Sequence, residues 1–257
     1  MSKVSMASAT QKKVIISEYA ASNLDKPSVI VGFPEAGLVG TIAASYLIQT
    51  LSLPELGYVE SSLEPAVIVV QKSMPKFPIR LFGKEDLAIF ISDIPLTARL
   101  AYELTDEIVR WSLLHNSRVL IGITGIPSEE RVSMEGKPRV LSVSTAERKD
   151  PIIEKLGGVQ SFDEGVIAGG YALLLKRCLS LNQPNITLLA ESHLQFPDPG
   201  AAAAIIDVLN PLLSMNVDVK QLLDESEQIR LKMRELMSRT QQSMQQMSQQ
   251  AAPRVYA

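Results

Sequence analysis

The sequence predicts an α/β fold in which a mostly parallel central sheet is flanked by helices. The expected strands at residues 28–33 and 118–123 are almost continuously apolar after their first residue, which is typical of strands covered on both faces. Helical patterns alternate with these runs along the chain, an order that favours parallel strand pairing. Hydrophobic residues make up 46% of the 257 residues, which is enough for one large core and excludes global disorder.

Each expected element follows from its local pattern. The expected strands are residues 14–16, 28–33, 66–70, 80–82, 87–92, 118–123 and 186–190. The expected helices are residues 38–51, 97–115, 165–181 and 199–213, the last with Pro199 suited to a helix start. Two β-hairpins should extend the sheet, one turning at residues 83–86 and one around Gly136 that pairs 131–135 with 138–144.

A long C-terminal helix is predicted over residues 217–249. Leu222, Ile229 and Leu236 recur every seven residues, and Thr240 and Ser243 interrupt this partial heptad seam. Two interpretations stay open: the helix packs back on its own domain, or it lies at a self-association interface. The chain then divides into an N-terminal segment (1–13), an α/β domain (14–216), this helix (217–249) and a tail (250–257).

The charge balance argues against nucleic acid as the main partner. The chain has 25 Lys and Arg against 28 Asp and Glu, a net charge of −3, whereas phosphate-backbone binding usually needs a basic excess. The single cysteine, Cys178, forms no intramolecular disulfide, and with His115 and His193 it makes a poor metal site. We therefore expect no metal and no cofactor.

Neither a targeting segment nor a membrane span is expected. Residues 1–13 lack the apolar core and cleavage site of a secretory signal. Residues 36–54 carry no charge, but they include Thr41, Ser45 and Gln49, so a buried helix explains them better than a membrane span. These features predict a cytoplasmic protein without a membrane partner.

The loop at residues 32–40 is the most phosphate-like segment of the chain. It lies between a predicted strand and a predicted helix, where backbone N–H groups can face an anion. Gly32 and Gly37 have the first spacing of a P-loop, but leucine and valine follow where lysine and serine or threonine are needed. Glu35 also places negative charge where a phosphate would lie. We favour a tight turn built around Gly32, Gly37 and Gly40, with a ligand-binding cleft as the alternative.

Three further polar residues follow predicted strands. Asp93 comes at the end of one buried strand, and Glu191 and His193 follow another. The carboxyl ends of strands in open α/β sheets are where ligands bind, so these side chains would belong to the same cleft if they converge. A histidine with carboxylates suits acid–base chemistry, but no nucleophile motif accompanies it. A structural or capping role is the favoured interpretation.

The sequence ends in a hydrophobic residue, a tyrosine and one further residue, Val255-Tyr256-Ala257. Such an ending can enter a pocket that a folded surface cannot reach. There the terminal carboxylate pairs with a basic side chain, while the tyrosine fills an apolar slot.

Five motifs spread along the chain form a distinctive series. The first is residues 29–45, with the sequence Val-Ile-Val-Gly-Phe-Pro-Glu-Ala-Gly-Leu-Val-Gly-Thr-Ile-Ala-Ala-Ser. The others are residues 90–95, 165–174, 189–193 and 196–199. Together they resemble the archaeal homologues of a eukaryotic proteasome assembly chaperone (proteasome assembly chaperone 2-like). The resemblance extends from about residue 14 to residue 227.

This resemblance implies a fold akin to nucleoside phosphorylases, without an established catalytic centre. It also implies a role for the tail, because proteasome-binding regulators insert a C-terminal hydrophobic-Tyr-any motif between neighbouring subunits of the outer alpha ring of the 20S core particle. Val255 would be the hydrophobic position, Tyr256 the tyrosine and Ala257 the terminal residue. The implied protein is a non-enzymatic homo-oligomer that opens the gate of the core particle without ATP, assists its assembly, or does both.

Two other functions stay open. The cleft near residues 32–40, Asp93 and His193 would bind or hydrolyse a nucleoside or nucleotide, an activity that survives removal of the tail. An assembly chaperone that holds ring subunits through its folded surface would make the tail dispensable.

Overall fold

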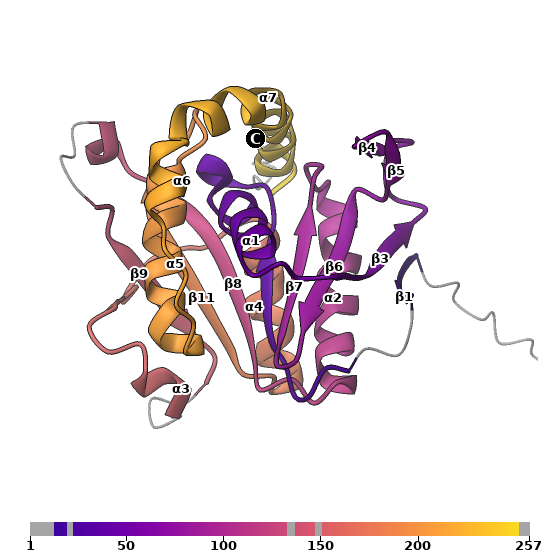
Figure 1. Ribbon diagram of the computed structural model, residues 1–257, viewed down its shortest axis with the longest axis horizontal. Helices are drawn as coiled ribbons and strands as arrows, with labels where there is room; N and C mark the ends of the chain where they lie inside the picture. The colour runs from indigo at the N-terminus through magenta and orange to yellow at the C-terminus, as the bar shows by residue number, and fades with distance from the viewer. Residues whose placement is uncertain (1–12, 20–22, 133–136, 147–150, 252–257) are drawn as a thin grey trace, which may run out of the picture.

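The computed structural model describes residues 13–19, 23–132, 137–146 and 151–251, and in this part of the chain nine strands form one sheet. Their order is β1-β3-β6-β7-β2-β8-β11-β9-β10, and helices cover both faces (Figure 1). The strands are β1 (Val14–Glu18), β2 (Ser28–Gly32), β3 (Glu55–Ser61), β6 (Ile79–Lys84), β7 (Leu87–Ser92), β8 (Val119–Pro127), β9 (Val140–Ser144), β10 (Gln160–Ser161) and β11 (Asn185–Ser192). The helices are α1 (Val39–Thr50), α2 (Ala98–Leu114), α3 (Pro151–Glu154), α4 (Gly170–Leu181), α5 (Pro199–Leu213), α6 (Lys220–Asp224) and α7 (Ser226–Ala251), with short 3₁₀ helices at Ala36–Leu38 and Glu129–Val132.

The sheet is mixed, which corrects the expectation of a mostly parallel one. Its centre, β7-β2-β8-β11, is parallel throughout. On one side β6, β3 and β1 continue it with antiparallel pairings, and on the other side β9 runs antiparallel to β11. Of these antiparallel pairs, β6 and β7 are joined by a tight turn, and such a short connection cannot return the chain to parallel register.

Two apolar layers enclose the sheet because its central strands are hydrophobic on both faces. Ile30 of β2 faces α1 and α5, whereas its neighbours Val29 and Val31 face α2 and α4. The alternation of side chains along a strand therefore explains the continuous apolar run at this position.

Several elements match their predicted bounds. The helix α5 starts at Pro199, and the carboxylate of Asp198 accepts a hydrogen bond from the N–H of Ala201 at 3.0 Å, which caps it. The hairpin of β6 and β7 pairs Lys84 with Leu87 and turns where it was expected. Thr97 caps α2 in the same way as Asp198 caps α5.

Other predictions are wrong or incomplete. The expected strand at 66–70 is reduced to β4 (Val69–Gln71), which pairs with β5 (Met74–Lys76) in a separate, exposed hairpin. The strand β3 was not predicted at all. The second hairpin does not form as expected, because residues 129–132 are a 3₁₀ helix and β9 pairs with β11 and β10. The helix expected from residue 165 begins at Gly170.

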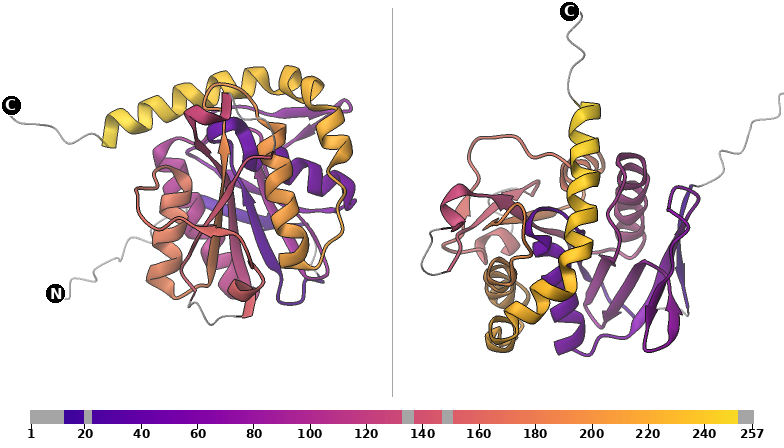
Figure 2. Two further views of the ribbon diagram at one scale, coloured as in Figure 1. Left: turned by 90° about the vertical axis from the view of Figure 1, so that its left-hand side faces the viewer. Right: turned by 90° about the horizontal axis from the view of Figure 1, so that it is seen from above.

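The long C-terminal helix is interrupted at Glu225 and lies on its own domain. Ser243 Oγ donates a hydrogen bond to the carbonyl of Leu96, just after β7, at 2.8 Å. Gln241 Nε2 donates to the carbonyl of Leu194, just after β11, at 3.4 Å. Met237 is 2% exposed and belongs to the apolar layer of α1 and α5. These contacts support the first of the two interpretations, although the last turns of α7 extend past the sheet (Figure 2).

Candidate functional site at the carboxyl edge of the sheet

The carboxylate of Glu35 lies at the start of α4, beyond the end of β2. Its Oε1 accepts a hydrogen bond from the N–H of Gly170 at 2.7 Å, and its Oε2 accepts one from Thr124 Oγ1 at 3.4 Å. Helix N-termini stabilise anions through free N–H groups and the helix dipole. The position that a phosphate would take at this helix therefore holds a carboxylate of the chain itself.

Burial makes this carboxylate a weak acid. Loss of solvent raises the pKa of Glu35 to about 7, against the opposing effect of hydrogen bonds from Gly170, Thr124 and the N–H of Tyr171. Tyr171 is itself buried, and its hydroxyl accepts a hydrogen bond from the N–H of Phe33 at 2.8 Å. The loop after β2 and the start of α4 are thus joined by two separate polar contacts.

The glycines of the loop at 32–40 allow close backbone approach. A Cβ on Gly40 would lie 2.3 Å from the carbonyl oxygen of Ile123, and one on Gly32 would lie 2.6 Å from the Cβ of Ala44. Gly37 has φ +62, in the left-handed region that glycine tolerates best. These geometries support the tight-turn interpretation of the segment.

Asp93 is held by a basic side chain from the neighbouring strand. It forms an ion pair with Arg80 Nη2, and Arg80 is 5% exposed as a residue. Arg80 Nη1 also lies 4.0 Å from Glu55 Oε2. Asp93 therefore neutralises a buried guanidinium, which is a structural role.

Glu191 and His193 have partners of their own. Arg139 Nε donates to Glu191 Oε1 at 3.0 Å, and this pairing lowers the pKa of Glu191. His193 Nε2 lies 3.9 Å from Oδ2 of Asp198, and the N–H of His193 donates to the same oxygen at 3.2 Å. Asp198 is fully buried and also accepts hydrogen bonds from Arg131 Nε at 2.8 Å and Arg131 Nη2 at 2.9 Å.

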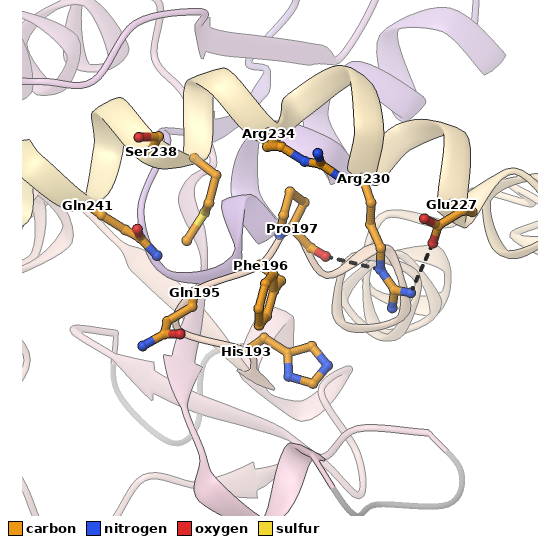
Figure 3. Close-up of a pocket in the computed structure, with 10 residues that line it drawn as sticks. His193, Gln195, Phe196, Pro197, Glu227, Arg230, Arg234, Ser238 and Gln241 are labelled. Atoms are coloured by element: carbon orange, nitrogen blue, oxygen red, sulfur yellow. Dashed lines mark hydrogen bonds and ion pairs between the residues drawn. The ribbon is translucent and has the colours of Figure 1, made fainter.

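The candidate residues do not share one cleft. Glu35 lines a cavity of about 580 Å³ beneath α7. His193 lines a cavity of about 450 Å³, shown in Figure 3, together with Phe196, Arg230 and Arg234. A third cavity of about 410 Å³ lies on the other side of the loop that carries His193. Asp93 and Glu191 line none of these three.

The geometry offers little for covalent or metal chemistry. The only cysteine, Cys178, is buried, and burial raises the pKa of its thiol to about 12, so it does not supply a thiolate. Burial lowers the pKa of His193, against the opposing effect of the nearby Asp198 carboxylate. Across the described ranges, His, Cys, Asp and Glu form no cluster that could hold a metal ion, and no helix is long and apolar enough to cross a membrane.

Sequence reasoning missed the partners of the candidate residues. Thr124 and Gly170 lie 89 and 135 residues from Glu35, and Arg131 lies 67 residues from Asp198. Nothing in the local pattern joins such pairs, because their proximity follows from strand order. The proposed docking residues Val255, Tyr256 and Ala257 lie outside the described residues; α7 ends before them, at Ala251.

Comparison with known proteins gives a consistent result. The model of the PAC2 family matches residues 29–237. An uncharacterized protein of Methanocaldococcus jannaschii is 33% identical over 221 residues, covering 85% of this chain and 89% of that protein. The crystal structure of Pyrococcus furiosus PbaA, an archaeal homolog of proteasome-assembly chaperone, superposes with a TM-score of 0.81 at 30% identity, covering 90% and 98% of the two chains. P. furiosus PbaB, an archaeal proteasome activator, shares the fold with a TM-score of 0.73 at 24% identity, covering 88% and 99%.

Proposed function

Since the chain belongs to the PAC2 family, we propose that it is a non-enzymatic cytoplasmic factor that binds the 20S proteasome core particle. The observation that carries this proposal is the similarity to PbaA, which extends over nearly the whole of both chains. The family match reaches residue 237 and so includes the sheet edge and the first half of α7, not the core sheet alone. The partner is taken from the description of that relative and from the sequence of the tail.

The tail is proposed to dock on the outer alpha ring of the core particle. Val255 would enter an apolar slot, Tyr256 would pack beside it and donate from its hydroxyl, and the terminal carboxylate of Ala257 would pair with a basic side chain. The 26 residues of α7 span about 39 Å, and its last turns extend past the domain (Figure 2). Six further residues reach at most about 20 Å when extended. The folded domain would thus present the tail at a distance from its own surface.

A single docked tripeptide would bind weakly, so we propose that several copies of the chain associate. Linked tails raise avidity by about 10²–10⁴ when the linker spans the sites. Docking would open the gate of the core particle, without ATP, only if the tails bind the open ring better than the closed one.

A nucleotide-binding or hydrolytic function is less well supported. Glu35 places its own carboxylate at the start of α4, where it would repel a phosphate. Asp93, Glu191 and His193 are each held by other partners, so no acid–base pair faces a common substrate position.

The proposal is tested by hydrolysis of a fluorogenic peptide by cognate 20S core particles without ATP. The full chain should stimulate hydrolysis, whereas Tyr256→Ala, a chain lacking residues 255–257 and a chain extended by one residue after Ala257 should not. Val166→Ala is a control, because Val166 is 92% exposed on the folded domain and should leave stimulation unchanged.

A binding assay with the same core particles separates the alternatives. Binding that survives removal of residues 255–257 would assign the contact to the folded surface and favour an assembly chaperone. Core particles that neither bind the full chain nor respond to it would overturn the proposal, and the sheet edge would then be the place to search for a function.

A further inference from the structure

A cavity of about 580 Å³, open to solvent on one side, lies beneath α7, at the carboxyl edge of the parallel strands. Its walls are the loop after β2, the start of α2 and the start of α4, and α7 covers it. Cavities that bind small molecules usually measure about 300–1,000 Å³ and are mostly apolar, with few polar groups. In open α/β sheets, such sites lie beyond the carboxyl ends of the strands.

Small side chains create this space. Ala98 and Ala101 of α2 and Ala172 of α4 line the cavity on opposite sides. Phe33 and Leu173 also line it and extend its apolar surface. The cavity therefore results from the alanines of α2 and α4. Elsewhere the two helices pack closely, and Leu104 and Leu174 are fully buried in the apolar layer that they form with the sheet.

The polar interruptions of the α7 seam coincide with the cavity. Thr240, Ser243 and Met244 of α7 form its cover. Thr240 Oγ1 donates to the carbonyl of Leu236 and Ser243 Oγ to that of Leu96, each at 2.8 Å. Both hydroxyl protons are thus satisfied by backbone carbonyls. Thr240 and Ser243 are short side chains and leave space that larger apolar residues of a continuous heptad would have filled.

Glu35 gives the cavity a negative charge. Among the described residues that line it, Glu35 is the one acidic or basic side chain, and it accepts hydrogen bonds from the hydroxyl of Thr124 and from backbone N–H groups. A carboxylate facing an apolar space, without a cation beside it, favours a positively charged or hydrogen-bond-donating ligand. It disfavours an anion, which distinguishes this cavity from a nucleotide site.

We infer that the cavity beneath α7 binds a small amphipathic amine, with an aromatic or alkyl body between α2 and α4 and an ammonium group at Glu35. This site is independent of the proposed tail docking. A ligand there would contact α7 as well as α2 and α4, so binding would also stabilise the cover.

Isothermal titration calorimetry with the full chain tests the inference through three matched probes: 4-phenylbutylamine, 4-phenylbutanol and 4-phenylbutyrate. At about pH 8, where Glu35 is ionised, the amine should bind about tenfold more tightly than the alcohol, and the butyrate should bind least. Lowering the pH to about 6 should weaken amine binding, since Glu35 is then mostly protonated.

Four variants test the location and the charge preference of the site. Ala172→Leu and, separately, Ala98→Leu fill the cavity and should abolish saturable binding of the amine. Lys176→Leu introduces the same side chain one turn along α4, outside the cavity lining, and should leave binding unchanged. Glu35→Gln should reduce the preference for amine over alcohol to near one.

The inference is overturned if the unaltered chain shows no saturable heat with the amine, or if both cavity-filling variants fold and bind it as before. Equal affinity for the amine and the butyrate would overturn the assignment of Glu35 as the recognition group. Circular dichroism of each variant establishes folding, and the probe series on the unaltered chain is decisive even if Glu35→Gln does not fold.

Discussion

The carboxylate of Glu35 accepts a hydrogen bond from the backbone N–H of Gly170, at 2.7 Å and across 135 residues of sequence. Gly169, at the N-cap of α4 with φ +83, makes room for this contact, because a Cβ there would lie 2.7 Å from Glu35 Oε1. The loop after β2 therefore supplies an acceptor that the helix lacks in its own N-cap. The N-terminus of a helix at this edge of the sheet commonly binds an anion, and here the carboxylate of Glu35 takes that position.

Replacing Glu35 by alanine should destabilise the protein. The N–H groups of Gly170 and Tyr171 would lose their acceptor in a buried position, at a cost of about 1–3 kcal/mol. Glu35→Gln keeps an acceptor oxygen and should cost less. Urea unfolding followed by circular dichroism compares the two, and an alanine variant as stable as the parent would show that water replaces the carboxylate without loss.

The free energy of unfolding should depend on pH through the ionisation of Glu35. Burial raises its pKa from 4.5 to about 7, so between these values the folded state holds a proton that the unfolded state has released. The contribution of Glu35 is therefore fully present below about pH 4.5 and is lost as the pH rises through about 7, at up to about 1.4 kcal/mol per pH unit.

Glu35→Gln isolates this effect, because Glu64 also has a pKa raised to about 7 and would otherwise add to it. The free energy of unfolding of the parent minus that of Glu35→Gln should fall between about pH 5 and 8. A difference that stays constant over this range would mean that Glu35 is already ionised in the folded state at low pH.

Much of the fold was predictable where local chemistry sets the structure. The bounds of α5 follow from Asp198 as a cap, Pro199 at the first turn and an alanine-rich continuation. The hairpin at residues 83–86 follows from a turn between two apolar runs. The strand β3 was missed because only Gly57 and Val59 are buried among its seven residues, which leaves a weak apolar pattern.

The candidate site was less predictable, because pairing depends on strand order. The expected hairpin around Gly136 was wrong since the best partner of β9 is β11, which lies more than forty residues further along the chain. Asp93 was correctly placed just after a strand, whereas Glu191 lies inside β11, which continues to Ser192. Arginines from neighbouring segments form ion pairs with both carboxylates. The local sequence predicts where a strand ends, but it does not predict which other strand will lie next to that strand in the sheet.

Asp198 should be the most sensitive carboxylate of the region. It is fully buried, caps α5 and pairs with Arg131, so Asp198→Ala should cost about 3–5 kcal/mol by leaving a buried guanidinium unpaired. Asp198→Asn keeps the cap and should cost less. The exposed pair of Asp86 and Arg118 is the control, because Asp86→Ala should cost about 1 kcal/mol or less in the same urea titration.

The attachment of α7 to the domain should depend on Met237. This side chain is 2% exposed in the layer formed by α1 and α5, so Met237→Ala should cost about 2–5 kcal/mol. Leu231 lies on the same helix but is 54% exposed, and Leu231→Ala should change stability by about 0.5 kcal/mol or less. Hydrogen exchange measures the effect locally: amides of residues 226–251 should exchange faster in Met237→Ala than in Leu231→Ala. Equal exchange in the two variants would mean that α7 is held by its polar contacts to Leu96, Leu194 and Pro197, and that the apolar layer ends at α5.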